Sequence, residues 1–120
     1  MNFDFATLAE FLRDRAMVLP DRIAYTFLRD GFEPSQTFSF GDLDRRARAI
    51  AVALQESAVA IRPGDRVLLI YPAGIEFIAG FFGCLYAGAV PIPAPDQARF
   101  KRAFPRHWWR SIKRPMRCTW

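Results

Sequence analysis

Two segments near the start of the chain repeat apolar residues at helical spacing. The first begins at Thr7 and is ended by Pro20, because proline lacks a backbone N–H and clashes with the preceding turn. The second follows Ser39, whose S-x-x-D spacing to Asp42 is typical of a capping box, and extends to about Ser57. We expect the apolar residues of this second helix to share one face: Leu43, Ala47, Ile50, Ala51 and Leu54. Asp44, Arg45 and Arg48 lie off this face.

Four other segments have the apolar pattern of strands. Arg22–Leu28 alternates apolar and polar residues, and a turn signal at Arg29–Gly31 separates it from Gln36–Phe40, which predicts a β-hairpin. Arg66–Tyr71 is an almost continuous apolar run, as expected of a strand covered on both faces. Val90–Pro93 is a second short strand, punctuated by prolines.

A third helical pattern, from Ile75 to about Ala87, lies between the last two strands. Small residues recur along this pattern, and we expect them to let the helix approach its neighbours closely: Gly80, Gly83, Cys84, Ala87 and Gly88. The order strand, helix, strand over Arg66–Pro93 predicts a βαβ unit with a right-handed parallel crossover. The fold class is therefore α/β.

The charge of the chain is unevenly distributed. With 120 residues, 52% of them hydrophobic, the composition fits one globular domain or a piece of one. Residues 1–98 carry nine arginines and 12 acids, a net −3, whereas residues 99–120 carry eight basic residues and no acid, a net +8. The basic end also holds all three tryptophans and the single histidine. We therefore divide the chain into an α/β region, 1–95, and an irregular basic, Trp-rich tail, 96–120.

Several classes of protein are disfavoured. Cys84 and Cys118 are too few for a disulfide framework, and no Cys/His cluster suggests zinc. The N-terminus has acids where a signal peptide needs a basic region. The most apolar stretch, residues 75–92, is interrupted by Glu76, three glycines and Pro91, which does not fit a membrane-spanning helix. We expect a cytoplasmic protein with reduced cysteines and no transmembrane segment.

Candidate chemistry is sparse. The chain has neither a G-x-G-x-x-G nor a G-x-x-x-x-G-K-[ST] motif, and glycines inside a helix cannot form a phosphate-cradling loop. The carboxylates Asp42, Asp44 and Asp65 fall at caps and turns, where we expect structural roles. Cys84, on an apolar helix face, is expected to be a buried small hydrophobe. We predict no catalytic, cofactor-binding or metal-binding residue in this chain.

The order of several segments resembles a known family. Phe38–Leu43 (FSFGDL) resembles the strand-to-helix start of the adenylate-forming enzymes, and Gly64–Val67 (GDRV) resembles part of their next block. Pro72–Phe77 (PAGIEF), paired with Phe81–Pro93 (FFGCLYAGAVPIP), looks most like fatty acyl-AMP ligases and long-chain acyl-CoA synthetases. The resemblance covers about Phe5–Pro95.

This resemblance implies ATP-dependent activation of a fatty acid. The fatty-acid carboxylate attacks the α-phosphate of ATP, which gives acyl-AMP and pyrophosphate, and the acyl group passes to CoA or to an acyl carrier protein. In the family, the phosphate loop, the ribose-binding Asp and the mobile lid that serve ATP and Mg²⁺ lie downstream of the matched region, and their motifs are not in these 120 residues. The resemblance implies an incomplete N-terminal region of such a ligase, inactive alone.

Residues 107–120 (HWWRSIKRPMRCTW) depart abruptly from the family pattern. A frame shift near Arg106 would turn the codons of His-Trp-Trp-Arg into a helix-compatible Leu-Val-Ala/Glu, so we interpret the tail as out-of-frame translation. Alternatively, the tail is solvated and functionless, or its basic residues and Phe104, Trp108 and Trp109 contact nucleic acid or an anionic membrane. A further alternative is a fragment that docks on a full-length ligase. We expect the family substrates rather than nucleic acid as partners.

Overall fold

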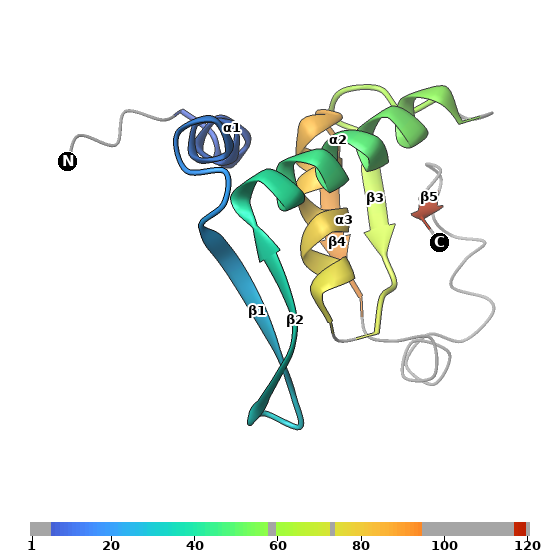
Figure 1. Ribbon diagram of the computed structural model, residues 1–120. Coiled ribbons are helices and arrows are strands. Elements are labelled where there is room, and N and C mark those ends of the chain that lie inside the picture. The colour runs from blue at the N-terminus through green and yellow to red at the C-terminus, as the bar shows by residue number, and fades with distance from the viewer. Residues whose placement is uncertain (1–5, 58–59, 73, 95–116, 120) are drawn as a thin grey trace.

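The computed structural model describes residues 6–57, 60–72, 74–94 and 117–119, and Figure 1 shows their arrangement. The described elements confirm the predicted order of helix, hairpin, helix and βαβ unit. In chain order they are α1 (Leu8–Val18), β1 (Ile23–Arg29), β2 (Glu33–Ser39), α2 (Phe40–Glu56), β3 (Arg66–Leu69), α3 (Ile75–Tyr86), β4 (Val90–Pro93) and β5 (Arg117–Thr119).

The hairpin β1–β2 is antiparallel and extends away from the helices (Figure 1). Gly31, at φ 79°, occupies the left-handed conformation that its turn requires. Strand β2 begins at Glu33, earlier than predicted, and includes Pro34, which pairs with Leu28 next to a shift in register. The strand tolerates this proline because, in the described part of the chain, the hairpin has two strands and each strand has an unpaired edge. Phe40, predicted to close the strand, is instead the first residue of α2.

Helix α2 begins with the predicted capping box. Asp42 N donates to Ser39 Oγ at 3.1 Å, and Ser39 N donates to Asp42 Oδ2 at 3.4 Å, so two N–H groups at the helix start are satisfied. The predicted apolar face is confirmed, with Leu43, Ala47, Ala51 and Leu54 buried and Ile50 partly buried. The prediction that Asp44 lies at a cap or turn is wrong. Asp44 lies within α2 and is only 9% exposed, and Tyr86 on α3 donates a hydrogen bond to it.

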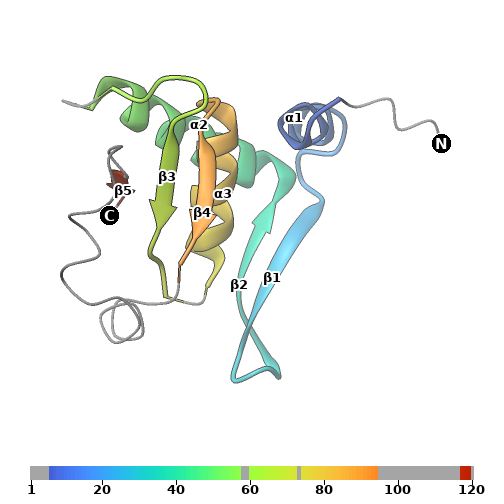
Figure 2. The same ribbon diagram turned by 180° about the vertical axis from the view of Figure 1, so that it is seen from behind.

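The second sheet is parallel, with strand order β4-β3-β5. Arg66 pairs with Val90 and Leu69 with Pro93, so the parallel βαβ unit is confirmed. Strand β3 ends at Leu69 rather than Tyr71, and its Val67 and Leu69 are fully buried. Helices α2 and α3 lie on the same side of β3 and β4, as Figure 2 shows from behind.

Small residues bring α2 and α3 together. A Cβ on Gly83 would lie 2.5 Å from Cγ2 of Ile50, so the predicted close approach is confirmed at this position. The prediction that Gly88 belongs to the helix is wrong. Ala87 caps α3, and Gly88, at φ 74°, turns the chain towards β4, while its carbonyl accepts a bond from Gly64 N at 2.8 Å.

Most of the predicted tail lies outside the described residues. Residues 95–116 and 120 are not described, and the frame-shift, solvated-tail and nucleic-acid or membrane hypotheses, with Arg106, Trp108 and Trp109, fall within them. Of the tail, the structure describes Arg117–Thr119 as strand β5, parallel to β3. Among the described helices, none is long and apolar enough to cross a membrane.

Candidate functional site

Helices α1, α2 and α3 meet at a cluster of polar side chains, which we call the Asp44 cluster: Arg13, Asp44, Arg48 and Tyr86. Tyr86 Oη donates to Asp44 Oδ1 at 2.6 Å, and Arg48 Nε donates to Asp44 Oδ2 at 2.7 Å. The guanidinium of Arg13, on α1, lies 5.0 Å from the centre of the Tyr86 ring, within cation–π range. Both carboxylate oxygens of Asp44 therefore have a partner, one on its own helix and one on α3.

Both groups that donate to Asp44, the Tyr86 hydroxyl and the Arg48 guanidinium, have a raised pKa. Burial, and then the hydrogen bond to Asp44, raise the pKa of Tyr86 above its ordinary value, so the hydroxyl stays a donor. The hydrogen bond to Asp44 raises the pKa of Arg48, which stays charged. A cluster whose donors keep their protons is not suited to acid–base exchange at neutral pH. The cluster instead links α1, α2 and α3 through polar and cation–π contacts, and we call this link the polar tie.

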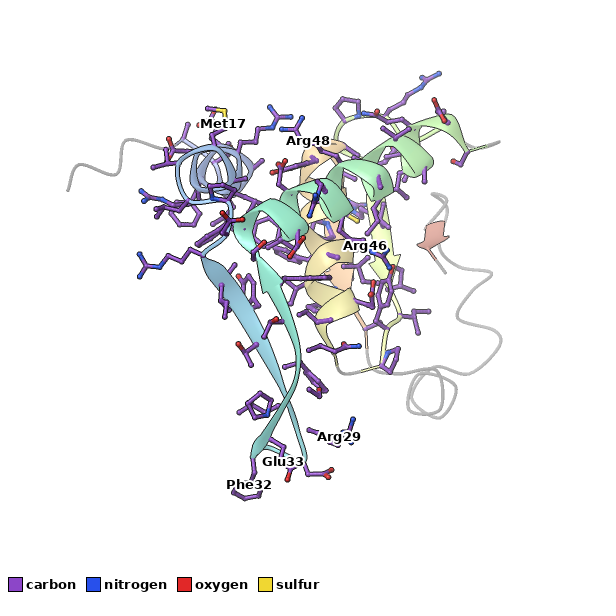
Figure 3. The ribbon with its side chains drawn as sticks, viewed as in Figure 1. Met17, Arg29, Phe32, Glu33, Arg46 and Arg48 are labelled. Atoms are coloured by element: carbon purple, nitrogen blue, oxygen red, sulfur yellow. The ribbon has the colours of Figure 1, made fainter. Side chains whose placement is uncertain are left out.

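A second group of charges includes Arg46, which lies on the other side of α2 from Arg48 (Figure 3). Arg46 Nη2 donates to both carboxylate oxygens of Glu76, at 3.2 and 3.1 Å, and so joins α2 to the first turn of α3. Arg45 pairs with Asp42 one turn away. Both arginines line a hollow of about 430 Å³ together with Thr37, Phe38, Asp42, Ala49 and Glu76. Each of the two arginines that line the hollow is paired with a carboxylate.

The residues singled out from the sequence occupy structural positions. The hydrogen bond from Ser39, and then the bond from Arg45, lower the pKa of Asp42 in the capping box. Asp65 accepts a bond from Arg62 N at 2.9 Å and closes the turn before β3. Burial raises the pKa of the Cys84 thiol to about 11, which disfavours the nucleophilic thiolate.

The structure does not bring these residues into one site. In the described part of the chain, no three His, Cys, Asp or Glu side chains gather where they could hold a metal ion. That the whole chain has no catalytic, cofactor or metal residue stays a prediction. Sequence reasoning missed the Asp44 cluster. The four-residue spacing from Asp44 to Arg48 was a visible signal, but the third partner, Tyr86, is 42 residues away.

A comparison with models of protein families identifies the family of this chain. Residues 12–103 match the family model of the AMP-binding enzymes. The chain belongs to this family. The match includes most of the elements described above. It extends beyond Pro95, the residue at which the resemblance seen in the sequence ends.

Relatives within the AMP-binding enzymes include fatty-acid ligases. The chain is 47% identical over 105 residues to the medium-chain-fatty-acid–[acyl-carrier-protein] ligase JamA of Moorena producens, covering 86% of this chain and 17% of JamA. It is 44% identical over 81 residues to Disco-interacting protein 2 of Drosophila melanogaster, covering 68% of this chain and 4% of the relative.

A solved structure confirms the fold of this AMP-binding region. The fatty acid AMP ligase from Legionella pneumophila superposes with a TM-score of 0.72 at 38% identity, covering 79% of this chain and 16% of that ligase. The predicted partial N-terminal subdomain of an adenylate-forming ligase is therefore confirmed. The chain spans less than a fifth of the length of each of these three relatives.

Proposed function

We propose that this chain is the N-terminal part of a ligase that activates a fatty acid as acyl-AMP and passes the acyl group to a carrier protein or to CoA. The observation that carries the proposal is the 47% identity to JamA, whose name specifies a medium-chain fatty acid and an acyl carrier protein. The similarity to a fatty acid AMP ligase of known structure supports the same substrate class.

In this proposal the chain supplies scaffold rather than chemistry. We infer that the described residues contact neither ATP nor Mg²⁺, and two observations support this inference. Arg45 and Arg46 are paired with carboxylates, and Gly80 and Gly83 pack inside α3 instead of forming a phosphate loop. The Asp44 cluster and the Arg46–Glu76 pair hold α1, α2 and α3 in place. We infer that the contacts to ATP, Mg²⁺ and the fatty acid come from residues beyond these 120, and that the chain alone is inactive.

Exchange between ATP and radioactive pyrophosphate tests the inactivity. The 120-residue chain, incubated with ATP, Mg²⁺ and fatty acids of several lengths, should give no exchange above a no-enzyme blank. Intact JamA in the same assay is the positive control. Fatty-acid-dependent exchange by the 120-residue chain would show that the active site is within it and would overturn this part of the proposal.

A chimera tests the assignment to the ligase itself. Residues 12–103 of this chain would replace the matching segment of JamA, and acyl-AMP formation would be measured with medium-chain fatty acids. We expect the chimera to retain activity, because the helices keep their cross-links within the exchanged segment. A second chimera with Leu43→Asp, which places a charge at a fully buried position, should lose activity. A first chimera that is folded but inactive would contradict the assignment.

A further inference from the structure

The outer edge of β4 is chemically different from its inner edge. On the inner side, Val90 N donates to Asp65 O at 2.7 Å and Ala94 N donates to Leu69 O at 3.0 Å, so both residues face β3. Along a strand, successive residues turn their N–H and C=O groups to opposite edges. Residues 91 and 93 therefore turn their backbone groups away from β3. In the described part of the chain, no strand pairs with that outer edge.

Both outward-facing residues are prolines. Pro91 and Pro93 have no N–H, so the outer edge of β4 presents their carbonyl oxygens and no donor. An added strand needs donors and acceptors in alternation, and here it would leave its own carbonyls without partners. In the sequence, proline continues to occupy every second position up to Pro95, since residues 90–95 read VPIPAP.

The opposite edge of the sheet has no such block. The carbonyls of Asp65 and Leu69 face β4, so by the same alternation Arg66 and Leu68 face the other way. Neither is a proline, and both keep donor and acceptor. The structure places a parallel strand, β5, along this edge, with Leu68 opposite Cys118.

We propose that this sheet extends in one direction only. Pro91 and Pro93 block the addition of any strand at β4, including β4 of a second copy, whereas the edge of β3 accepts a parallel strand, here β5. Prolines on an exposed edge are one of the devices that prevent edge-to-edge association. The interaction surface of the sheet is therefore the edge of β3, and the strand it takes is parallel.

Restoring the missing donors tests the proposal. The variant Pro91→Val/Pro93→Val keeps a β-favouring residue at both positions and adds two outward N–H groups to the 120-residue chain. We expect sedimentation velocity over a concentration series to show self-association strengthened on the order of tenfold relative to the unmodified chain. The amides of residues 91 and 93 should exchange with deuterium more slowly as the protein concentration rises.

Two further variants make the result specific. Pro72→Val removes an exposed proline outside the strands, and its sedimentation should match that of the unmodified chain. If the double variant loses its far-UV circular dichroism, the single Pro93→Val, at an exposed position, replaces it. A folded variant that sediments as the unmodified chain does, with exchange at residue 93 independent of concentration, would overturn the proposal.

Discussion

Replacing Gly83 by alanine tests how closely α2 and α3 must approach. A Cβ at this position would lie 2.5 Å from Cγ2 and 2.7 Å from Cβ of Ile50, and 3.3 Å from the carbonyl oxygen of Ala47. Rotation of the Ile50 side chain could move its Cγ2, but its Cβ is fixed to the backbone of α2. The two helices must therefore separate, and the contacts between them weaken.

The expected loss follows from two opposing effects. Overpacking of a well-packed core costs roughly 1–3 kcal/mol, and contacts with two atoms below van der Waals distance favour the upper part of that range. Replacing glycine by alanine inside a helix gains about 1 kcal/mol in helix propensity. We expect Gly83→Ala to lower the free energy of unfolding by about 1–2 kcal/mol in total.

Gly80→Ala is the matched control, because it makes the same change in the same helix. Its Cβ would meet the outer atoms of the Tyr71 ring, the nearest at 2.9 Å, and the end of a flexible side chain can move aside. We expect its stability to be unchanged or raised by up to about 1 kcal/mol. Urea unfolding followed by far-UV circular dichroism measures both variants. If Gly83→Ala proves as stable as Gly80→Ala, the close helix approach does not limit packing and the reasoning is refuted.

Two other predictions concern buried polar groups. Tyr86→Phe removes the donor to Asp44 Oδ1 and should lower the free energy of unfolding by about 1–2 kcal/mol in urea at pH 7, and an unchanged midpoint would contradict the polar tie. Burial raises the pKa of Cys84 from 9.0 to about 11 in the folded state, so its contribution to stability is complete below pH 9 and is lost as the pH rises through 11. The fall in thermal midpoint between these pH values should therefore be smaller for Cys84→Ala than for the unmodified chain, and equal slopes would count against burial of the thiol.

Local patterns predicted most of the fold, because the signals for helix ends and strands lie within a few residues. The capping box at Ser39 and the stop at Pro20 are examples, and the structure places helix ends close to both. The errors arose where a residue's position depends on a contact with a residue far away in the sequence. Asp44 is buried because Tyr86, far along the chain, donates to it, and Gly88 leaves the helix to turn towards β4.

The candidate site was harder to predict for a different reason. A site can be inferred from sequence when its motif is in the chain, but here the resemblance to the ligases rests on scaffold segments. The sequence predicted a close approach at Gly83, but only the structure identified its neighbour, Ile50. Whether the chain carries any catalytic residue therefore depends on assays rather than on pattern.

The projecting hairpin divides the chain into parts of unequal local stability. Its tip holds Arg29, Phe32 and Glu33, far from the helices (Figure 3), and Phe32 is 87% exposed. An isolated two-stranded hairpin is marginally stable, whereas the βαβ unit shares a buried core with α2. The hairpin should consequently open in many more molecules than the core does at any moment. Within the described residues, a protease that needs an unfolded loop would cut at this tip before it cuts the helices or the parallel sheet.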